Sequence, residues 1–129
     1  MSSVTLWKDR DKKTIDPLLF SEVAEAKAKQ LGGKGFRVNK GSQLRRFFDE
    51  VVRLNDTAKA NAAGMELVLP YLHMLIAKAA YAKGRKLVCD DFVGLIKDGV
   101  GQIETKDDLR VFTNFFEAMM AFYKLHGPN

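Results

Sequence analysis

The stretch SQLRRFFDEVVRLNDTA, residues 42–58, decides the fold class of this chain. Its apolar residues recur at helical spacing, so an α-helix would place them on one face. They are Leu44, Phe47, Phe48, Val51, Leu54 and Ala58. Ser42 stands where an N-cap is expected, because its hydroxyl can accept a backbone N–H. The pattern predicts an amphipathic helix from Ser42 to about Ala63.

A helix is also predicted on the N-terminal side of this stretch. Asp16 is a suitable N-cap, and Pro17 fits the first helical position, where its missing N–H is not needed. The pair Gly32-Gly33 ends this helix because glycine adopts left-handed conformations without a steric penalty. We expect residues 1–16 to form an irregular arm and residues 32–41 to form a flexible basic loop.

The most apolar stretch of the chain, residues 67–81, predicts a third helix. This helix would begin at Met65 or Leu69 and end near Lys83, with Gly84 as its stop. Apolar residues occupy most of its sides, which is typical of a helix at the centre of a bundle. Lysines interrupt the stretch, so no membrane span is expected.

Two further helices are predicted in the C-terminal half. Asp90 or Asp91 is placed to cap a short fourth helix. Thr105 followed by Asp108 resembles a capping box at the start of a fifth helix that reaches about His126. No segment alternates apolar and polar residues in the manner of a strand. The sequence therefore predicts an all-α protein, a compact bundle of about five helices.

The fifth helix has aromatic residues on more than one side. Its main stripe consists of Leu109, Phe112, Phe116, Met119, Met120 and Tyr123. Phe115 and Phe122 lie beside that stripe. Two interpretations stay open for this pair: burial on a second face of the helix, or packing against another protein chain.

Composition bounds the class of protein. The chain has 129 residues, 47% of them hydrophobic, which predicts one helical domain over residues 1–129. The formal charge of +5 and the isoelectric point near 9.4 favour acidic partners. Cys89 is the single cysteine, which excludes an internal disulfide and suits a reducing compartment. The charged N-terminus does not resemble a signal peptide, so we expect a cytoplasmic protein without a membrane anchor.

The sequence offers no set of residues for catalysis. His73 and His126 each lack a second metal ligand three or four residues away. The pairs Asp90-Asp91 and Asp107-Asp108 stand at expected helix starts, where carboxylates complement the helix dipole. The glycines around Lys34 do not match a phosphate-binding loop. We expect no enzyme activity, no metal and no cofactor.

Two stretches contain basic residues and no acid, namely Lys27–Arg46 and Lys78–Lys86. Such one-sided charge favours a polyanion, and neutralising several phosphates gives salt-sensitive binding that is independent of base sequence. The candidate nucleic-acid-binding residues are Arg45, Arg46, Arg53, Lys78, Lys83, Arg85, Lys86, Lys34, Arg37 and Lys40. For Arg46, a salt-bridged solvated helix face is an equally good interpretation, since Glu50 lies four residues on. No recognition helix or base-stacking signature occurs, so contact with backbone is expected instead of base recognition.

Three motifs in order resemble a known family. They are SQLRRFFDEV at 42–51, KAAYAKGR at 78–85 and FTNFFEAMMAFYK at 112–124. Together they resemble the small helical subunit of type III-A (Csm-type) CRISPR effector complexes, over roughly residues 40–126. Ala79 and Met119-Met120 depart from the family pattern, but at core positions that leave the basic residues unaffected.

The resemblance implies a non-enzymatic, all-helical subunit that is present in several copies per complex. These copies would line the duplex of guide RNA and target RNA, opposite the repeated backbone subunits, and help to join the large signature subunit. The family's basic positions correspond to Arg45, Arg46, Lys78 and Arg85, whereas the other candidates rest on charge alone. The resemblance therefore predicts RNA backbone binding, with Arg45, Arg46 and Arg85 on one face. The alternative is a helical protein-interaction module whose basic patch binds acidic protein partners.

Overall fold

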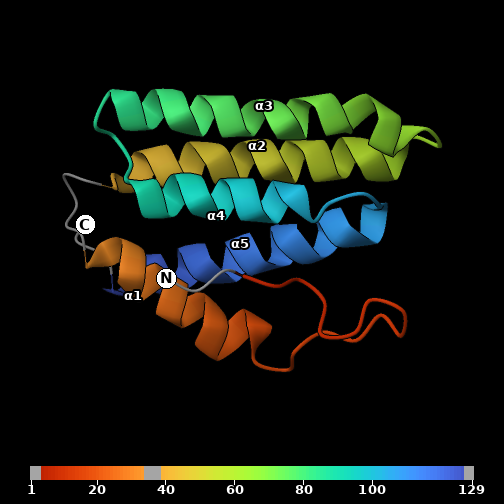
Figure 1. Cartoon of the computed structure of the whole chain (residues 1–129), viewed down its shortest axis with the longest axis horizontal. Coiled ribbons are helices and arrows are strands. Elements are labelled where there is room, and N and C mark those ends of the chain that lie inside the picture. Colours follow the sequence, from red (N-terminus) through yellow and green to blue (C-terminus); the bar gives the residue numbers. More distant parts are fainter. Residues whose placement is uncertain (1–3, 34–38, 127–129) are drawn as a thin grey trace.

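The computed structural model describes residues 4–33 and 39–126. Within these residues the chain forms five α-helices, the first of which continues a π-helical segment (Figure 1). The elements are η1 (Leu19–Val23), α1 (Ala24–Gly32), α2 (Gly41–Ala60), α3 (Gly64–Gly84), α4 (Asp90–Gly101) and α5 (Lys106–His126). The described part contains no strand, only an isolated bridge between Asp9 and Thr14. The predicted all-α class is confirmed.

The core lies between α2, α4 and α5 and is rich in phenylalanine. The ring of Phe92 lies 5.2 Å from that of Phe47 and 6.3 Å from that of Phe116, in edge-on geometry. Phe112 adds a further edge-on contact with Phe116 at 5.9 Å. Such pairs contribute about 0.5–1.5 kcal/mol beyond the burial of their area. Phe115 is also fully buried, so the side of α5 next to the main stripe packs within this chain.

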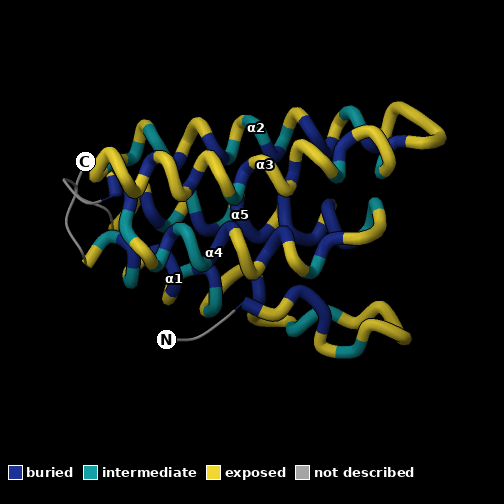
Figure 2. Tube along the Cα trace, turned by 45° about the horizontal axis from the view of Figure 1, so that its top comes forward, coloured by how far each residue is buried: buried dark blue, intermediate teal, exposed yellow. Residues whose placement is uncertain are grey.

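The prediction that α3 occupies the centre of the bundle is wrong. α5 packs against both α1 and α2, whereas α3 packs against α2 and α4 and forms the outer edge (Figure 1). Only one side of α3 is buried, and Figure 2 shows its exposed side. Large apolar residues on that exposed side are Leu67 (51% exposed), Tyr71 (58%), Met74 (51%) and Tyr81 (68%). Hydrophobicity on all sides of a helix indicates that two faces need a partner, but not that both partners belong to the same chain.

Helix starts agree with the predictions at α5 and differ at α2 and α4. The capping box is confirmed: the Asp108 N–H donates to Thr105 Oγ1 (3.1 Å), and the Thr105 N–H donates to Asp108 Oδ2 (3.0 Å). Ser42 is not the cap of α2, which begins at Gly41 after an extended Lys40. The predicted aspartate cap of α4 is also displaced: Cys89 occupies the N-cap, and both aspartates lie in the first turn.

The N-terminal residues 4–18 form turns and an isolated bridge and are anchored to the helices. Val4, Leu6 and Trp7 are buried in the core. Trp7 Nε1 donates to Asp108 Oδ1 (2.7 Å), and the Arg10 guanidinium donates to the same oxygen (2.9 Å). Burial acts to raise the pKa of Asp108, but hydrogen bonds from backbone N–H groups and from Trp7 outweigh it and lower the pKa. The capping residue of α5 therefore also attaches the arm.

Candidate nucleic-acid interface

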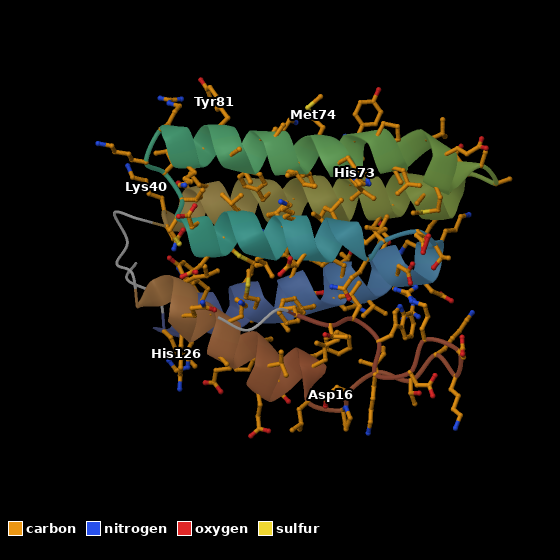
Figure 3. All side chains as sticks on the ribbon, in the orientation of Figure 1. Asp16, Lys40, His73, Met74, Tyr81 and His126 are labelled. Carbon is orange, nitrogen blue, oxygen red and sulfur yellow. The ribbon has the colours of Figure 1, made fainter. Side chains whose placement is uncertain are left out.

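The start of α2 and the end of α3 meet at one end of the bundle. The Lys40 N–H donates to the Leu87 carbonyl (3.2 Å), and the Cys89 N–H donates to Asn39 Oδ1 (2.9 Å). Figure 3 shows Lys40 at the same end of the molecule as Tyr81 of α3. Two stretches that are far apart in sequence and free of acids are thereby brought side by side.

Asn39 holds this junction together from inside. It is fully buried, and its Nδ2 donates to the Leu31 carbonyl at the end of α1 (3.1 Å). The Tyr123 hydroxyl of α5 donates to the Asn39 carbonyl (2.5 Å). Burial raises the pKa of Tyr123, so the phenol stays protonated and remains a donor. These bonds fix the residue before Lys40 against α1 and α5.

The end of α3 places a lysine in an unusual backbone conformation. Gly84 is the last residue of α3, but it does not take the left-handed conformation expected of a glycine that ends a helix. The Lys86 N–H donates to the Lys83 carbonyl (2.8 Å) and the Leu87 N–H to the Ala82 carbonyl (2.9 Å), which is the Schellman pattern. Lys86 therefore takes the left-handed position, with φ of 62°, where glycine is usual. A residue with a side chain in this conformation lowers the free energy of unfolding by about 1–2 kcal/mol. Lys86 is therefore a destabilising residue at this position.

A groove between α2 and α3 gathers a second part of the basic set. The groove is lined by Gln43, Arg46, Phe47, Glu50, Leu75 and Lys78. Arg53 donates to Glu50 Oε2 at 2.7 Å, and this hydrogen bond is the main cause that lowers the pKa of Glu50. The negative charge of Glu50 is thus paired with Arg53. Arg53 would have to leave this ion pair to contact RNA in its predicted role.

Arg45 lies on the other side of α2 from Arg46. It lines a groove between α2 and α5 together with Lys124, and its Nε donates to Asp49 (3.1 Å). The expectation that Arg45 and Arg46 share one face is therefore wrong, since neighbouring residues on a helix point about 100° apart. Lys124 was not predicted, although it closes the third sequence motif.

The predicted cations differ in how far they are already neutralised. Lys83 forms an ion pair with Asp90 at 2.5 Å, and this pair reduces the affinity of Lys83 for an external anion. In the described part of the chain, five other predicted cations of this end form no ion pair. They are Lys40, Arg46, Lys78, Arg85 and Lys86. Lys34 and Arg37 lie outside the described residues.

The histidines and carboxylates of the chain are the candidates for other chemistry, such as metal binding. Residues 4–33 and 39–126 contain no group of three or more side chains arranged to hold a metal ion. His73 is exposed on α3, and His126 Nε2 lies 2.6 Å from Glu25 in a contact between α5 and α1. None of the helices described is long and apolar enough to cross a membrane.

Comparison with known proteins then gives the family. The family described as Csm2 Type III-A matches residues 17–129. This chain belongs to the Csm2 family of type III-A systems. The resemblance inferred from three motifs is thereby confirmed, and the match reaches further toward the N-terminus than those motifs. Csm2 is a small structural subunit of type III-A CRISPR complexes. No curated protein and no solved structure matches the chain.

Proposed function

We propose that this Csm2 protein is a non-enzymatic RNA-binding scaffold that lines the guide RNA–target RNA duplex. The observation that supports this most directly is the junction of α2 and α3, where Lys40 lies beside the segment that follows α3. That junction collects five predicted cations without ion pairs at one end of the bundle. Phosphate groups are the ligands that such a set fits best.

The chemistry of this end suits backbone contact. Guanidinium groups donate in a planar fork to phosphate oxygens, and lysines act as point charges beside them. None of the described helices presents the pattern of a recognition helix. Base pairing between guide and target supplies the sequence specificity in such assemblies, so the protein has only to follow phosphates and A-form shape.

Membership of the family extends the proposal to the partners. The expected partners are guide RNA and target RNA, the repeated backbone subunits, the large signature subunit and neighbouring copies of this chain, in the cytoplasm. The end of the bundle that carries Lys40 would face RNA, which leaves the other surfaces of the protein for contacts with these subunits. No reaction is assigned to any residue.

The test is binding of the purified protein to a guide–target duplex across a salt series. Arg46→Glu and Arg85→Glu are expected to weaken binding and to flatten its salt dependence, because each removes a phosphate contact. Lys59→Glu is the matched control, since Lys59 lies at the far end of α2 and pairs weakly with Asp56 (3.8 Å). Equal effects of all three changes would mean that only net charge matters. Unchanged binding by the first two, with retention of RNA by the assembled complex, would favour an acidic protein partner.

A further inference from the structure

Tyr81 is an exposed aromatic residue at the basic end of the bundle, and phosphate contact alone gives it no role. The residue is 68% exposed, and Figure 3 shows its side chain pointing away from the bundle at the end where Lys40 lies. In the described part of the chain, its hydroxyl forms no hydrogen bond. The fold therefore uses neither the burial nor the hydrogen bonding that usually accounts for a tyrosine.

The neighbours of Tyr81 on the outer side of α3 are cations. Residues three or four positions apart lie side by side on a helix, so Lys78 and Arg85 flank Tyr81 on the two adjoining turns. Both flanking residues are exposed, and in the described residues neither forms an ion pair. The ring thus lies between two positive charges that are available to an external anion.

A second tyrosine of α3 has different neighbours. Tyr71 is 58% exposed, and at the corresponding spacings it has Leu67 and Met74 beside it. Clustered apolar side chains of that kind are typical of a surface that contacts another protein. Tyr81 has cations in both places, so its surroundings favour a ligand that is flat, apolar on its faces and negatively charged beside them.

One side of the Tyr81 ring is occupied by Arg85. The guanidinium carbon lies 6.0 Å from the ring centroid, which is a cation–π arrangement. A planar guanidinium over a ring still has N–H groups at its edge, and these can donate to phosphate oxygens. Gly84 follows Tyr81 by one turn, and the space where its Cβ would stand is open. The exposed part of the ring therefore has room for a flat group.

An aromatic ring between cations suits a nucleotide whose base is unpaired. Any base can stack on the ring, while the cations beside it neutralise the adjoining phosphates. A base inside a continuous duplex is stacked on its neighbours and cannot reach a side chain on the protein surface. We propose that Tyr81 stacks on an unpaired base of the bound RNA, with Lys78 and Arg85 on the phosphates beside it.

This contact deepens the proposed function and rests on it, because the phosphate contacts bring the base to the ring. Stacking accepts every base, so it adds preference for an RNA shape and no preference for a base sequence. The protein should therefore prefer RNA that has a bulge over a continuous duplex. No base-stacking motif was found in the sequence, since Tyr81 is a single aromatic residue whose exposure only the structure shows.

Binding to two guide–target duplexes tests the contact, one fully paired and one with a single-nucleotide bulge in the target strand. The unaltered protein should bind the bulged duplex more tightly. Tyr81→Ala should weaken binding to the bulged duplex roughly 5- to 150-fold, the range for loss of one base–aromatic stack, and should leave the paired duplex unaffected. The salt dependence should not change, because no charge is removed. 2-Aminopurine in the bulge should fluoresce less with the unaltered protein than with Tyr81→Ala, since stacking quenches it.

Two variants serve as controls. Tyr81→Phe should bind both duplexes as the unaltered protein does, because the ring is sufficient for stacking. Tyr71→Ala removes an exposed tyrosine from the same side of α3 and should also leave both affinities unchanged. A loss with Tyr81→Phe as large as with Tyr81→Ala would overturn stacking, because the hydroxyl would then make the contact.

Other outcomes separate this proposal from the proposed function. Equal binding of the bulged duplex by Tyr81→Ala and the unaltered protein would overturn stacking, while weaker binding by Arg46→Glu would still support phosphate contact. Equal losses for the paired and the bulged duplex would also overturn it, since the ring would then hold no unpaired base. If Tyr81→Ala binds RNA normally but releases another subunit from the assembled complex, Tyr81 is a protein contact. If neither Tyr81→Ala nor Arg46→Glu changes RNA retention by the protein or by that complex, both proposals fail.

Discussion

Lys86→Gly should stabilise the protein slightly while it weakens RNA binding. Lys86 has φ of 62°, and relief of its left-handed conformation is worth about 1–2 kcal/mol. The greater freedom of glycine in the unfolded chain takes back about 1 kcal/mol. The net change in the free energy of unfolding is therefore between zero and about +1 kcal/mol, a rise in Tm of up to about 4 °C. Few single changes to a basic surface are expected to act in these two opposite directions.

The binding effect follows from the loss of one phosphate contact. The slope of log affinity against log salt should become shallower by about 0.7–0.9. Lys86→Gln is the matched control, because glutamine keeps the left-handed penalty of an ordinary residue with a Cβ and removes the charge. It should reproduce the binding loss without the stability gain.

Denaturant unfolding and a salt series on the same samples measure both quantities. Unchanged affinity and slope for Lys86→Gly would show that Lys86 does not contact RNA. A destabilisation by Lys86→Gly would contradict the conformational argument, and the control would then show whether loss of charge is responsible.

Two more predictions concern the fold itself. A Cβ at Gly99 would stand 2.2 Å from the Phe112 ring, so Gly99→Ala should lower the free energy of unfolding by about 1–3 kcal/mol. Gly101→Ala is the control and should not lower it, because the space around Gly101 is open. Equal denaturation midpoints for the two variants would show that the Phe112 ring moves aside. Because the pKa of Asp108 is lower in the folded than in the unfolded chain, its contribution is complete above about pH 4 and is lost as the pH falls further. Emission from the single tryptophan, Trp7, should shift to the red below that pH, and Asp108→Asn should show the shift at neutral pH; an arm that stays attached in the variant contradicts this role.

Local chemistry was predictable wherever neighbours in sequence decide it. The capping box of Thr105 and Asp108 was confirmed because its two hydrogen bonds span one helical turn. The end of α3 was predicted at Gly84, but the left-handed residue is Lys86. Glycine preference is a statistical tendency, and the contacts of Leu87 with α3 and with Lys40 decide the actual end.

The candidate site was predictable as a set of residues and not as a surface. The acid-free stretches identify which part of the chain is basic. Only the bond from Lys40 to the Leu87 carbonyl shows that the two stretches adjoin. In the sequence, Lys83 and Arg85 are equivalent candidates for phosphate contact, but in the structure Lys83 forms an ion pair with Asp90. Ion pairs between elements depend on tertiary distances, which spacing along the sequence does not contain.

The sequence by itself determined the all-α class, the number of helices and the basic segments, because helical periodicity and local charge are properties of neighbouring residues. The tertiary structure decided that α5 is central and that α3 lies at the edge with its second apolar face exposed. It also separated Arg45 from Arg46 into two grooves. The reason is physical: an apolar face requires burial, but which element buries it depends on how all helices pack together.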